Sequence, residues 1–348
     1  MRVARLFISI VFLVIFLSCS RNVYEVMYPT LQDGKYDSEF PYRACSEELD
    51  TISRSVIKVM CTTQYQSFIF TDERYTADEI TSSILKRADY VQYFSNNTIG
   101  TGTIILQNPT RMAILTCSHI FDRPDTLIYY FSGTDSTKDR YVRSVSIKRQ
   151  QHNIAPELFK ARGDYLEFLI FDRDQDVAIL SKTFEPDESP LAFQALPYPF
   201  GRAKELEWGS FVYLFGYPKG IKALTKGIVS QPDYRKDAFL IDASFNRGMS
   251  GGLILAVRDG VPNFELAGMA TSAFTDTDEL LIPHEQYRSD PRTPYTGESY
   301  ITTMKRINYG LSIVITSETI LDLIRAHLDD LYDQGYDFSH LFKEESEE

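Results

Sequence analysis

Short apolar segments recur between turn residues over most of the chain, and this pattern limits the fold more than any other feature. No helical pattern alternates with these segments, as crossover helices would in a parallel sheet. Phenylalanine and tyrosine, which favour strands, are abundant at 23 and 22 residues. The pattern therefore favours an antiparallel barrel or sandwich. The predicted strands span 55–60, 90–94, 101–106, 112–116, 165–171, 177–180, 211–215, 238–241, 253–257 and 264–270.

One helical pattern follows the strand-rich region. Ser317 can cap its start, and Gly335 can end it. Residues 332–348 are then expected to form an acidic C-terminal tail. The apolar residues that share one face of this predicted helix are Ile320, Leu321, Ile324, Leu328 and Leu331.

The N-terminus has the features of an export signal. Arg2 and Arg5 precede an apolar run over 6–17, which is shorter than the ~20 residues of a membrane-spanning helix. The run ends at Phe16-Leu17-Ser18-Cys19, which resembles the lipobox of bacterial lipoproteins. We predict a signal peptide over 1–18, a lipidated Cys19 and an N-terminal tether over 19–52. An ordinary signal peptide without lipidation is the alternative.

Charge and cysteine content exclude several classes of site. The formal net charge of −12 argues against a nucleic-acid partner, because phosphate binding needs clustered lysine and arginine. Export permits disulfides, but Cys45, Cys61 and Cys117 allow one bridge at most. No C-x-x-C spacing occurs and the histidines are scattered, so no metal site is predicted.

A glycine-rich turn surrounds one serine in Gly248-Met249-Ser250-Gly251-Gly252. A nucleophilic serine needs a tight turn with backbone N–H groups beside it, which hold the oxyanion of a tetrahedral intermediate. Glycine at 248 permits the unusual backbone conformation that such an N–H requires. Glycine–serine turns are also common in ordinary loops, so the motif alone leaves a catalytic and a structural role open.

Two further polar residues lie at the ends of predicted strands. His119 follows the apolar strand 112–116, where a general base could be held, and Asp176 immediately precedes the strand 177–180. Alone, His119 could be a partly buried structural residue and Asp176 a strand-capping acid. The order His, Asp, Ser, with each residue at a strand end, favours a catalytic triad with Ser250.

With these residues in place, the chain resembles the trypsin-like serine peptidases, specifically their HtrA-related branch. The resemblance covers about 53–331. The segments that carry it, besides the three residues above, are Gly100-Thr101-Gly102-Thr103-Ile104-Ile105, Phe215-Gly216-Tyr217-Pro218-Lys219-Gly220, Thr225-Lys226-Gly227-Ile228-Val229-Ser230, the nucleophile loop 242–252 and the last strand 308–315.

The resemblance implies two antiparallel six-stranded β-barrels with a C-terminal α-helix, and a peptidase domain over 53–331. In such a site Ser250 attacks the peptide carbonyl, His119 transfers the proton, and Asp176 orients the imidazole. The backbone N–H groups of Gly248 and Ser250 would form the oxyanion hole. No cofactor is required.

The resemblance also suggests how a polypeptide substrate is bound. Thr271, Ser272 and Ala273 align with the strand edge that pairs with the substrate backbone. Ser244 aligns with the floor of the specificity pocket, and this neutral floor implies an apolar or small residue before the scissile bond. An alignment shifted by two residues would place Asp242 there instead.

The sequence departs from the family pattern in several places. Met249 replaces the aspartate that a new N-terminal amine pairs with in digestive relatives, so that activation route is not expected. Arg247 and Met249 replace the proline and asparagine common in HtrA proteins, and no PDZ domain follows the predicted barrel. Insertions are expected at about 122–163 and 274–307. The second would gate the substrate edge or form a passive surface loop.

These observations predict an exported serine endopeptidase, anchored by lipid in the bacterial cell envelope, that hydrolyses polypeptide substrates. A catalytically silent binding or scaffold lipoprotein with the same fold is the alternative. An esterase is less favoured, because G-x-S-G-G lacks the strand-to-helix elbow of α/β-hydrolases.

Overall fold

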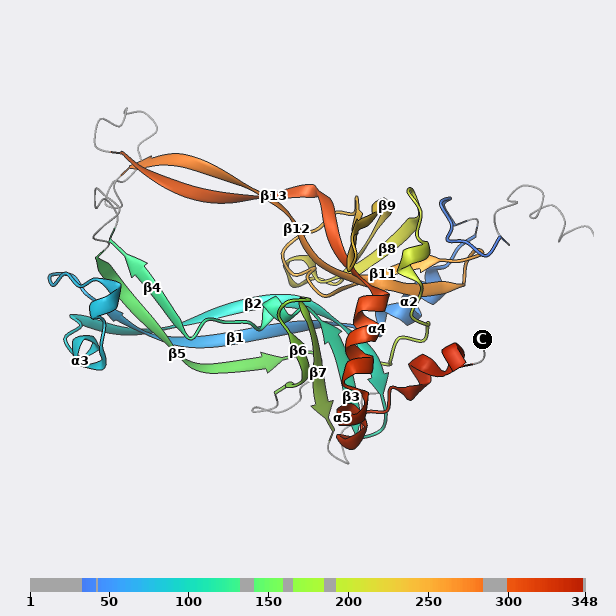
Figure 1. Ribbon diagram of the computed structural model, residues 1–348, viewed down its shortest axis with the longest axis horizontal. Coiled ribbons are helices and arrows are strands. Elements are labelled where there is room, and N and C mark those ends of the chain that lie inside the picture. The colour runs from blue at the N-terminus through green and yellow to red at the C-terminus, as the bar shows by residue number, and fades with distance from the viewer. Residues whose placement is uncertain are drawn as a thin grey trace, which may run out of the picture.

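Two antiparallel β-sheets form the framework of the computed structural model of the protein (Figure 1). The structure describes residues 33–41, 43–131, 141–158, 165–184, 192–283 and 299–346. The first sheet has seven strands in the order β4-β5-β1-β2-β3-β7-β6. These strands are β1 (Val56–Ile69), β2 (Tyr90–Gln107), β3 (Arg111–Thr116), β4 (Thr126–Tyr130), β5 (Val142–Ile154), β6 (Glu167–Asp172) and β7 (Val177–Thr183).

The second sheet is a closed barrel of six strands in the order β10-β13-β12-β11-β8-β9. Its strands are β8 (Phe211–Gly216), β9 (Ala223–Arg235), β10 (Ala238–Ile241), β11 (Gly252–Val257), β12 (Phe264–Pro283) and β13 (Ser299–Thr316). The predicted all-β, trypsin-like fold class is therefore confirmed. The first sheet differs in detail from a six-stranded barrel, because it stays open and the expected insertion 122–163 contributes β4 and β5 to it.

Burial on both faces explains the continuous apolar runs in the barrel. Along β8, Val212 and Leu214 pack into the barrel interior, whereas Phe211, Tyr213 and Phe215 pack into a second cluster with β11. A strand covered on both faces needs no alternation of polar and apolar residues. This packing fixes the strands that support the nucleophile loop.

Four α-helices are described, namely α2 (Ser46–Ser53), α3 (Ser82–Leu85), α4 (Ser317–Ala326) and α5 (Leu328–Asp333). The predicted closing helix is thus two helices, interrupted at His327. Its cap is also shifted by one residue, because the side chain of Thr316 accepts from the Thr319 N–H at 3.3 Å. Ser317 instead donates to the Gly201 carbonyl at 2.7 Å. Gly335 ends the helical region with φ +83°.

The expected C-terminal tail is in part core. Tyr336 and Phe338 are buried against the first sheet, together with Ile320, Leu323 and Ile324 of α4. The negative charge of the tail does not prevent this, because these apolar side chains alternate with exposed acidic ones.

The described part of the expected tether, from residue 33, lies on the barrel. Tyr36 is buried and its ring lies 4.1 Å from the guanidinium of Arg258. The Asp37 backbone exchanges hydrogen bonds with Val257 and Phe211, and Ile52 of α2 is fully buried. The aromatic and aliphatic side chains of this stretch explain why it packs.

The export predictions concern residues that the structure leaves out. The signal peptide 1–18 and Cys19 lie outside the described residues. In the part of the chain that is described, no helix is long and apolar enough to cross a membrane. Cys45, Cys61 and Cys117 are buried free thiols.

Candidate active site

The three residues of the predicted triad come from loops where the two sheets meet. His119 lies in a short 3₁₀ turn (Ser118–Ile120) after β3, and Asp176 immediately precedes β7. Strands β3 and β7 pair with Thr116 opposite Ala178, so their ends bring His119 and Asp176 together. Ser250 lies in the loop between β10 and β11 of the closed barrel.

The three side chains form a continuous hydrogen-bonded series. His119 Nδ1 lies 2.8 Å from Asp176 Oδ2 and 3.0 Å from Oδ1. On the other side of the ring, His119 Nε2 lies 3.0 Å from Ser250 Oγ. With Asp176 accepting from Nδ1–H, Nε2 is left as the acceptor that faces the serine hydroxyl. In this geometry, His119 Nε2 can accept the hydroxyl proton of Ser250.

Asp176 is held by more than the imidazole. The His119 backbone N–H donates to Asp176 Oδ1 at 3.0 Å, and Ser118 Oγ donates to the same oxygen at 3.2 Å. Asp176 itself has φ +56°, a left-handed conformation that few non-glycine residues adopt. Such conformations persist where surrounding contacts enforce them. The carboxylate is therefore fixed before any substrate binds.

In the turn from Gly248 to Gly252, three of the five backbone N–H groups are already bonded. Those of Met249, Gly251 and Gly252 donate to Asn246, Ala270 and Met249 carbonyls at 2.9, 2.8 and 2.8 Å. Within the described residues, the N–H groups of Gly248 and Ser250 have no acceptor. These are the two donors expected to form an oxyanion hole, and they are free to bind one.

The backbone around residue 248 leaves room for glycine but not for a side chain. It has φ +99°, and a Cβ at this position would lie 2.2 Å from the Tyr217 carbonyl oxygen. A side chain would therefore displace backbone, not a flexible neighbour. The loop can keep its shape only with glycine here.

Thr101 of β2 joins the loop to the first sheet, a role that sequence reasoning missed. Its hydroxyl donates to the Gly248 carbonyl at 2.7 Å and accepts from the Tyr217 N–H at 2.9 Å. The Thr101 N–H also donates to the Ser250 carbonyl at 2.8 Å. These contacts hold the Gly248–Ser250 turn against β2. Sequence reasoning missed these contacts because they join residues that are far apart in the chain, and no local pattern marks such a threonine.

Arg247 and Met249, the two residues of the nucleophile loop that depart from the family pattern, have different environments in the structure. Met249 is buried in the barrel core, and Arg247 is exposed while its carbonyl accepts from the Lys219 N–H at 2.8 Å. Met249 therefore acts as a core residue at the position where digestive relatives have aspartate. Arg247 contributes its backbone to the turn.

The predicted substrate-binding residues fall into two groups. Ser250 Oγ lies 3.1 Å from the Thr271 carbonyl, so Thr271, Ser272 and Ala273 begin a strand edge at the nucleophile. Ser244 is exposed, and its place on a pocket floor stays a prediction. The alternative residue, Asp242, accepts from the Ile228 N–H at 2.6 Å and so supports the β9–β10 connection.

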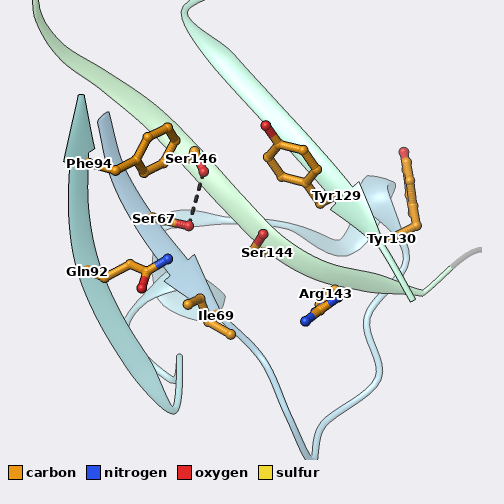
Figure 2. A pocket seen from close by; sticks show the side chains of 9 residues that line it. All are labelled: Ser67, Ile69, Gln92, Phe94, Tyr129, Tyr130, Arg143, Ser144 and Ser146. Atoms are coloured by element: carbon orange, nitrogen blue, oxygen red, sulfur yellow. Dashed lines mark hydrogen bonds between the residues drawn. The ribbon is translucent and has the colours of Figure 1, made fainter. Parts of the chain in front are cut away.

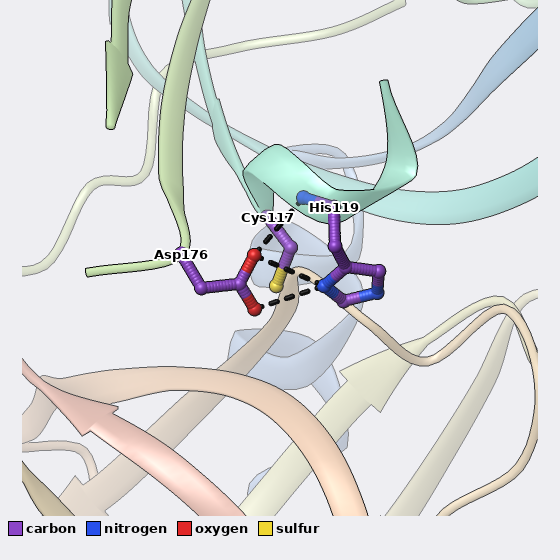
Figure 3. A group of neighbouring side chains, drawn as sticks. All are labelled: Cys117, His119 and Asp176. Carbon is purple, nitrogen blue, oxygen red and sulfur yellow. Dashed lines mark hydrogen bonds and ion pairs between the residues drawn. The ribbon is translucent and has the colours of Figure 1, made fainter. Parts of the chain in front are cut away.

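Cys117, His119 and Asp176 lie close enough that their ligand atoms could surround a metal ion (Figure 3). Hydrogen bonding accounts for the group without one. Cys117 Sγ donates to the Ala270 carbonyl at 3.5 Å. Complete burial, reinforced by the Asp176 carboxylate, raises the pKa of this thiol well above its usual value.

A separate hollow of about 420 Å³ lies on the outer part of the first sheet (Figure 2). It is lined by residues of β1, β2, β4 and β5, among them Phe94 and Tyr129. Ser146 donates to Ser67 at its base at 3.0 Å. None of the predicted site residues lines it.

A closed antiparallel barrel beside a second β-sheet, with serine, histidine and aspartate joined at their interface, defines the trypsin-like class of serine peptidase fold. Residues 100–262 match the family model of the trypsin-like peptidase domain. This part of the chain is therefore similar to a trypsin-like peptidase domain. No curated protein matches the chain.

The folded unit extends beyond the matched region on both sides. β1 precedes residue 100, and β12 and β13, which close the barrel, follow residue 262. The matched part contains His119, Asp176 and Ser250. The substrate-edge residues from Thr271 onward lie in the part that the match does not cover.

Proposed function

We propose that the protein is a serine endopeptidase that cleaves polypeptides through an acyl-enzyme, with His119, Asp176 and Ser250 as its triad. The observation that carries this proposal is the 3.0 Å contact between His119 Nε2 and Ser250 Oγ, with Asp176 on Nδ1 of the same ring. The trypsin-like peptidase domain supports the same reaction class.

In the first half of the reaction, Ser250 Oγ attacks the carbonyl carbon of the scissile bond as His119 Nε2 takes its proton. Asp176 stabilises the imidazolium that forms. The tetrahedral intermediate collapses when His119 gives the proton to the departing amine, which leaves an ester on Ser250. Water, deprotonated by His119, then attacks this ester and releases the new carboxyl end of the peptide.

The oxyanion of both tetrahedral intermediates would be bound by the N–H groups of Gly248 and Ser250. They are the N–H groups of the turn that have no acceptor among the described residues. Removing one donor from such a hole usually costs about 3 kcal/mol of transition-state stabilisation.

Labelling with a fluorophosphonate tests the proposal, because this probe forms a covalent bond only with an activated serine. We expect labelling of the native protein at Ser250, and none in Ser250→Ala. His119→Gln should reduce the labelling rate by orders of magnitude while the fold is retained. An absence of Ser250-dependent labelling would instead support a scaffold or binding protein that has this fold.

We further propose that the protein is exported and lipid-anchored through Cys19. The support is the sequence Phe16-Leu17-Ser18-Cys19 after a short apolar run. Expression in bacteria with radiolabelled palmitate should label the native protein and not Cys19→Ser. Export without labelling would support the ordinary signal peptide.

A further inference from the structure

Large apolar side chains are exposed along the outside of β9 and next to it. Val229 packs into the barrel interior, so Leu224, Lys226 and Ile228 point outward from the same strand. Leu224 and Ile228 are 37% and 40% exposed, and three neighbouring apolar side chains are each more than two-thirds exposed. Together these residues form the β9 face, which consists of Phe40, Trp208, Ile221, Leu224 and Ile228.

Contacts connect the members of the β9 face into one surface. The ring of Phe40 lies 5.1 Å from that of Phe211, whose partner in the sheet is Ile228. The turn that carries Trp208 is joined to β9 by a backbone hydrogen bond of 2.9 Å. Ile221 precedes the first residue of β9 by two positions. A contiguous exposed surface of this kind marks a binding face.

Lysine accompanies these apolar side chains, although the chain as a whole is acidic. Residues 216–232 contain three lysines, Lys219, Lys222 and Lys226, and no acidic residue, whereas the chain has a formal net charge of −12. All three are exposed, and they outnumber Glu39, the acidic neighbour of Phe40. The Lys226 ammonium lies 5.9 Å from the centre of the Phe40 ring, so positive charge borders the apolar surface directly. Aromatic rings and lysine side chains are both favoured where hydrocarbon meets anionic lipid headgroups.

The N-terminal segment reaches the barrel at this same surface. Lys35 pairs with Glu207 at 2.9 Å, beside the turn that carries Trp208, and Phe40 is itself part of the face. Figure 1 shows this segment, in blue, against the barrel. Cys19 lies 14 residues before residue 33, where the described chain begins. These residues span at most about 50 Å when extended, so a lipid on Cys19 would hold the barrel to a membrane from the edge of the β9 face.

We propose that the β9 face lies on an anionic lipid bilayer, with its apolar side chains among the headgroups and its lysines against the lipid phosphates. This inference rests on the proposed lipid anchor at Cys19. The anchor brings the protein to the membrane, and the face determines which side of the barrel contacts it. Apolar insertion and the attraction of basic side chains to anionic lipid would both contribute to the contact.

Trp208 is the single tryptophan of the chain, so tryptophan fluorescence reports on the β9 face alone. The native protein is bound to vesicles of phosphatidylethanolamine and phosphatidylglycerol, with and without bromine on the acyl chains as a quencher. We expect the emission to shift to shorter wavelength and the brominated lipid to quench at least about half of it, because an interfacial side chain lies roughly 5–10 Å into the headgroup and acyl boundary. Vesicles of phosphatidylcholine should quench less at low salt.

Phe40→Ser combined with Ile221→Ser removes two exposed members of the face and keeps the fluorescent reporter. We expect the quenched fraction of Trp208 emission to fall at least about twofold, since two apolar side chains no longer leave water on contact. Tyr93→Ser is the matched control. Tyr93 lies on β2 of the first sheet and is 72% exposed, against 73% for Phe40, so its loss should leave the quenching unchanged.

The outcomes separate the β9 face from the anchor on which it rests. Unchanged Trp208 emission in protein that sediments with the vesicles would overturn the role of the face while the anchor stands. An emission shift that depends on protein concentration and needs no lipid would show that a second copy covers the face, and would overturn the proposal as well. Loss of palmitate labelling would overturn the anchor alone. Quenching by added vesicles would then still decide the face, because it does not require Cys19.

Discussion

At the scale of single residues, the backbone of Gly248 is the most constrained feature of the candidate site. Gly248→Ala would place a methyl group 2.2 Å from the Tyr217 carbonyl oxygen and so move the turn that carries both proposed oxyanion donors. We expect kcat for peptide cleavage to fall by about 10²–10³. Gly209→Ala is the control, because Gly209 also has positive φ but a Cβ there meets nothing within 4 Å. Equal losses in the two variants would show that backbone strain alone is responsible.

Thr101 is expected to stabilise the same turn through its hydroxyl group. Thr101→Val keeps the side-chain shape but leaves the buried Gly248 carbonyl and Tyr217 N–H without their partner. We expect the free energy of unfolding to fall by about 1–3 kcal/mol, measured by urea denaturation. Thr101→Ser retains the hydroxyl and should lose much less. Equal stability of the valine and native proteins would exclude the bridging role.

Sequence reasoning reached part of the site and missed the rest for a physical reason. His119, Asp176 and Ser250 stand at strand ends in an order that a local reading can detect. Thr101 and Tyr217 support the turn through contacts between residues separated by 116 and 147 positions. Such contacts depend on how the two sheets pack, and no local pattern encodes them.

At the scale of elements, the cap of α4 tests the shifted helix start. Thr316→Ala removes the side-chain acceptor of the Thr319 N–H, which should destabilise the protein by about 1 kcal/mol. The melting temperature checks this, with Thr316→Ser as the control that keeps a cap. An unchanged melting temperature in Thr316→Ala would mean that α4 is held by its packing on the first sheet alone.

Most of the strands that could be predicted have one or both faces buried in a core. β8 and β11 appear as unbroken apolar runs because both of their faces are covered. Within β2, residues 90–94 and 101–106 were predicted as two strands, and the residues between them were missed, because 95–98 are polar, mostly exposed and leave no apolar periodicity. The outer parts of β12 and β13, from Thr275 and Ile307 outward, were not predicted as strands for the same reason. This region was expected to be an insertion that gates the substrate edge or forms a passive surface loop.

At the scale of the whole molecule, the N-terminal segment makes folding stability depend on pH. Burial, with nearby acidic groups, raises the pKa of Asp37 to about 6, although the Gly260 N–H partly offsets this. The native state therefore holds this proton at pH values where the unfolded chain has released it. The contribution of Asp37 to stability thus falls as pH rises from about 4 to about 6.

Asp37→Asn removes this titration while keeping an acceptor for the Gly260 N–H. We expect the variant to be more stable than the native protein by about 1–2 kcal/mol at pH 7 and equally stable near pH 4. Denaturation curves at the two pH values measure the difference. A stability difference that does not change with pH would contradict the role given to burial of the carboxylate.

The candidate site forms where the two sheets meet, because each sheet supplies catalytic residues that the other does not have. The first sheet holds His119 and Asp176, and the barrel holds Ser250 and the edge that begins at Thr271. The antiparallel β-fold could be inferred from the strand pattern, and its trypsin-like form from the resemblance to that family. That the first sheet stays open, and that β12 and β13 continue as a pair from Thr275 to Pro283, required the structure.

The most direct test of this account is cleavage of an unstructured polypeptide by the native protein and by Ser250→Ala, with products identified by mass spectrometry. We expect the native protein to release fragments at internal peptide bonds and the variant to be slower by about 10⁴-fold or more. His119→Gln should resemble Ser250→Ala, because the two residues act as one unit. Cleavage that continues undiminished in Ser250→Ala would contradict the account.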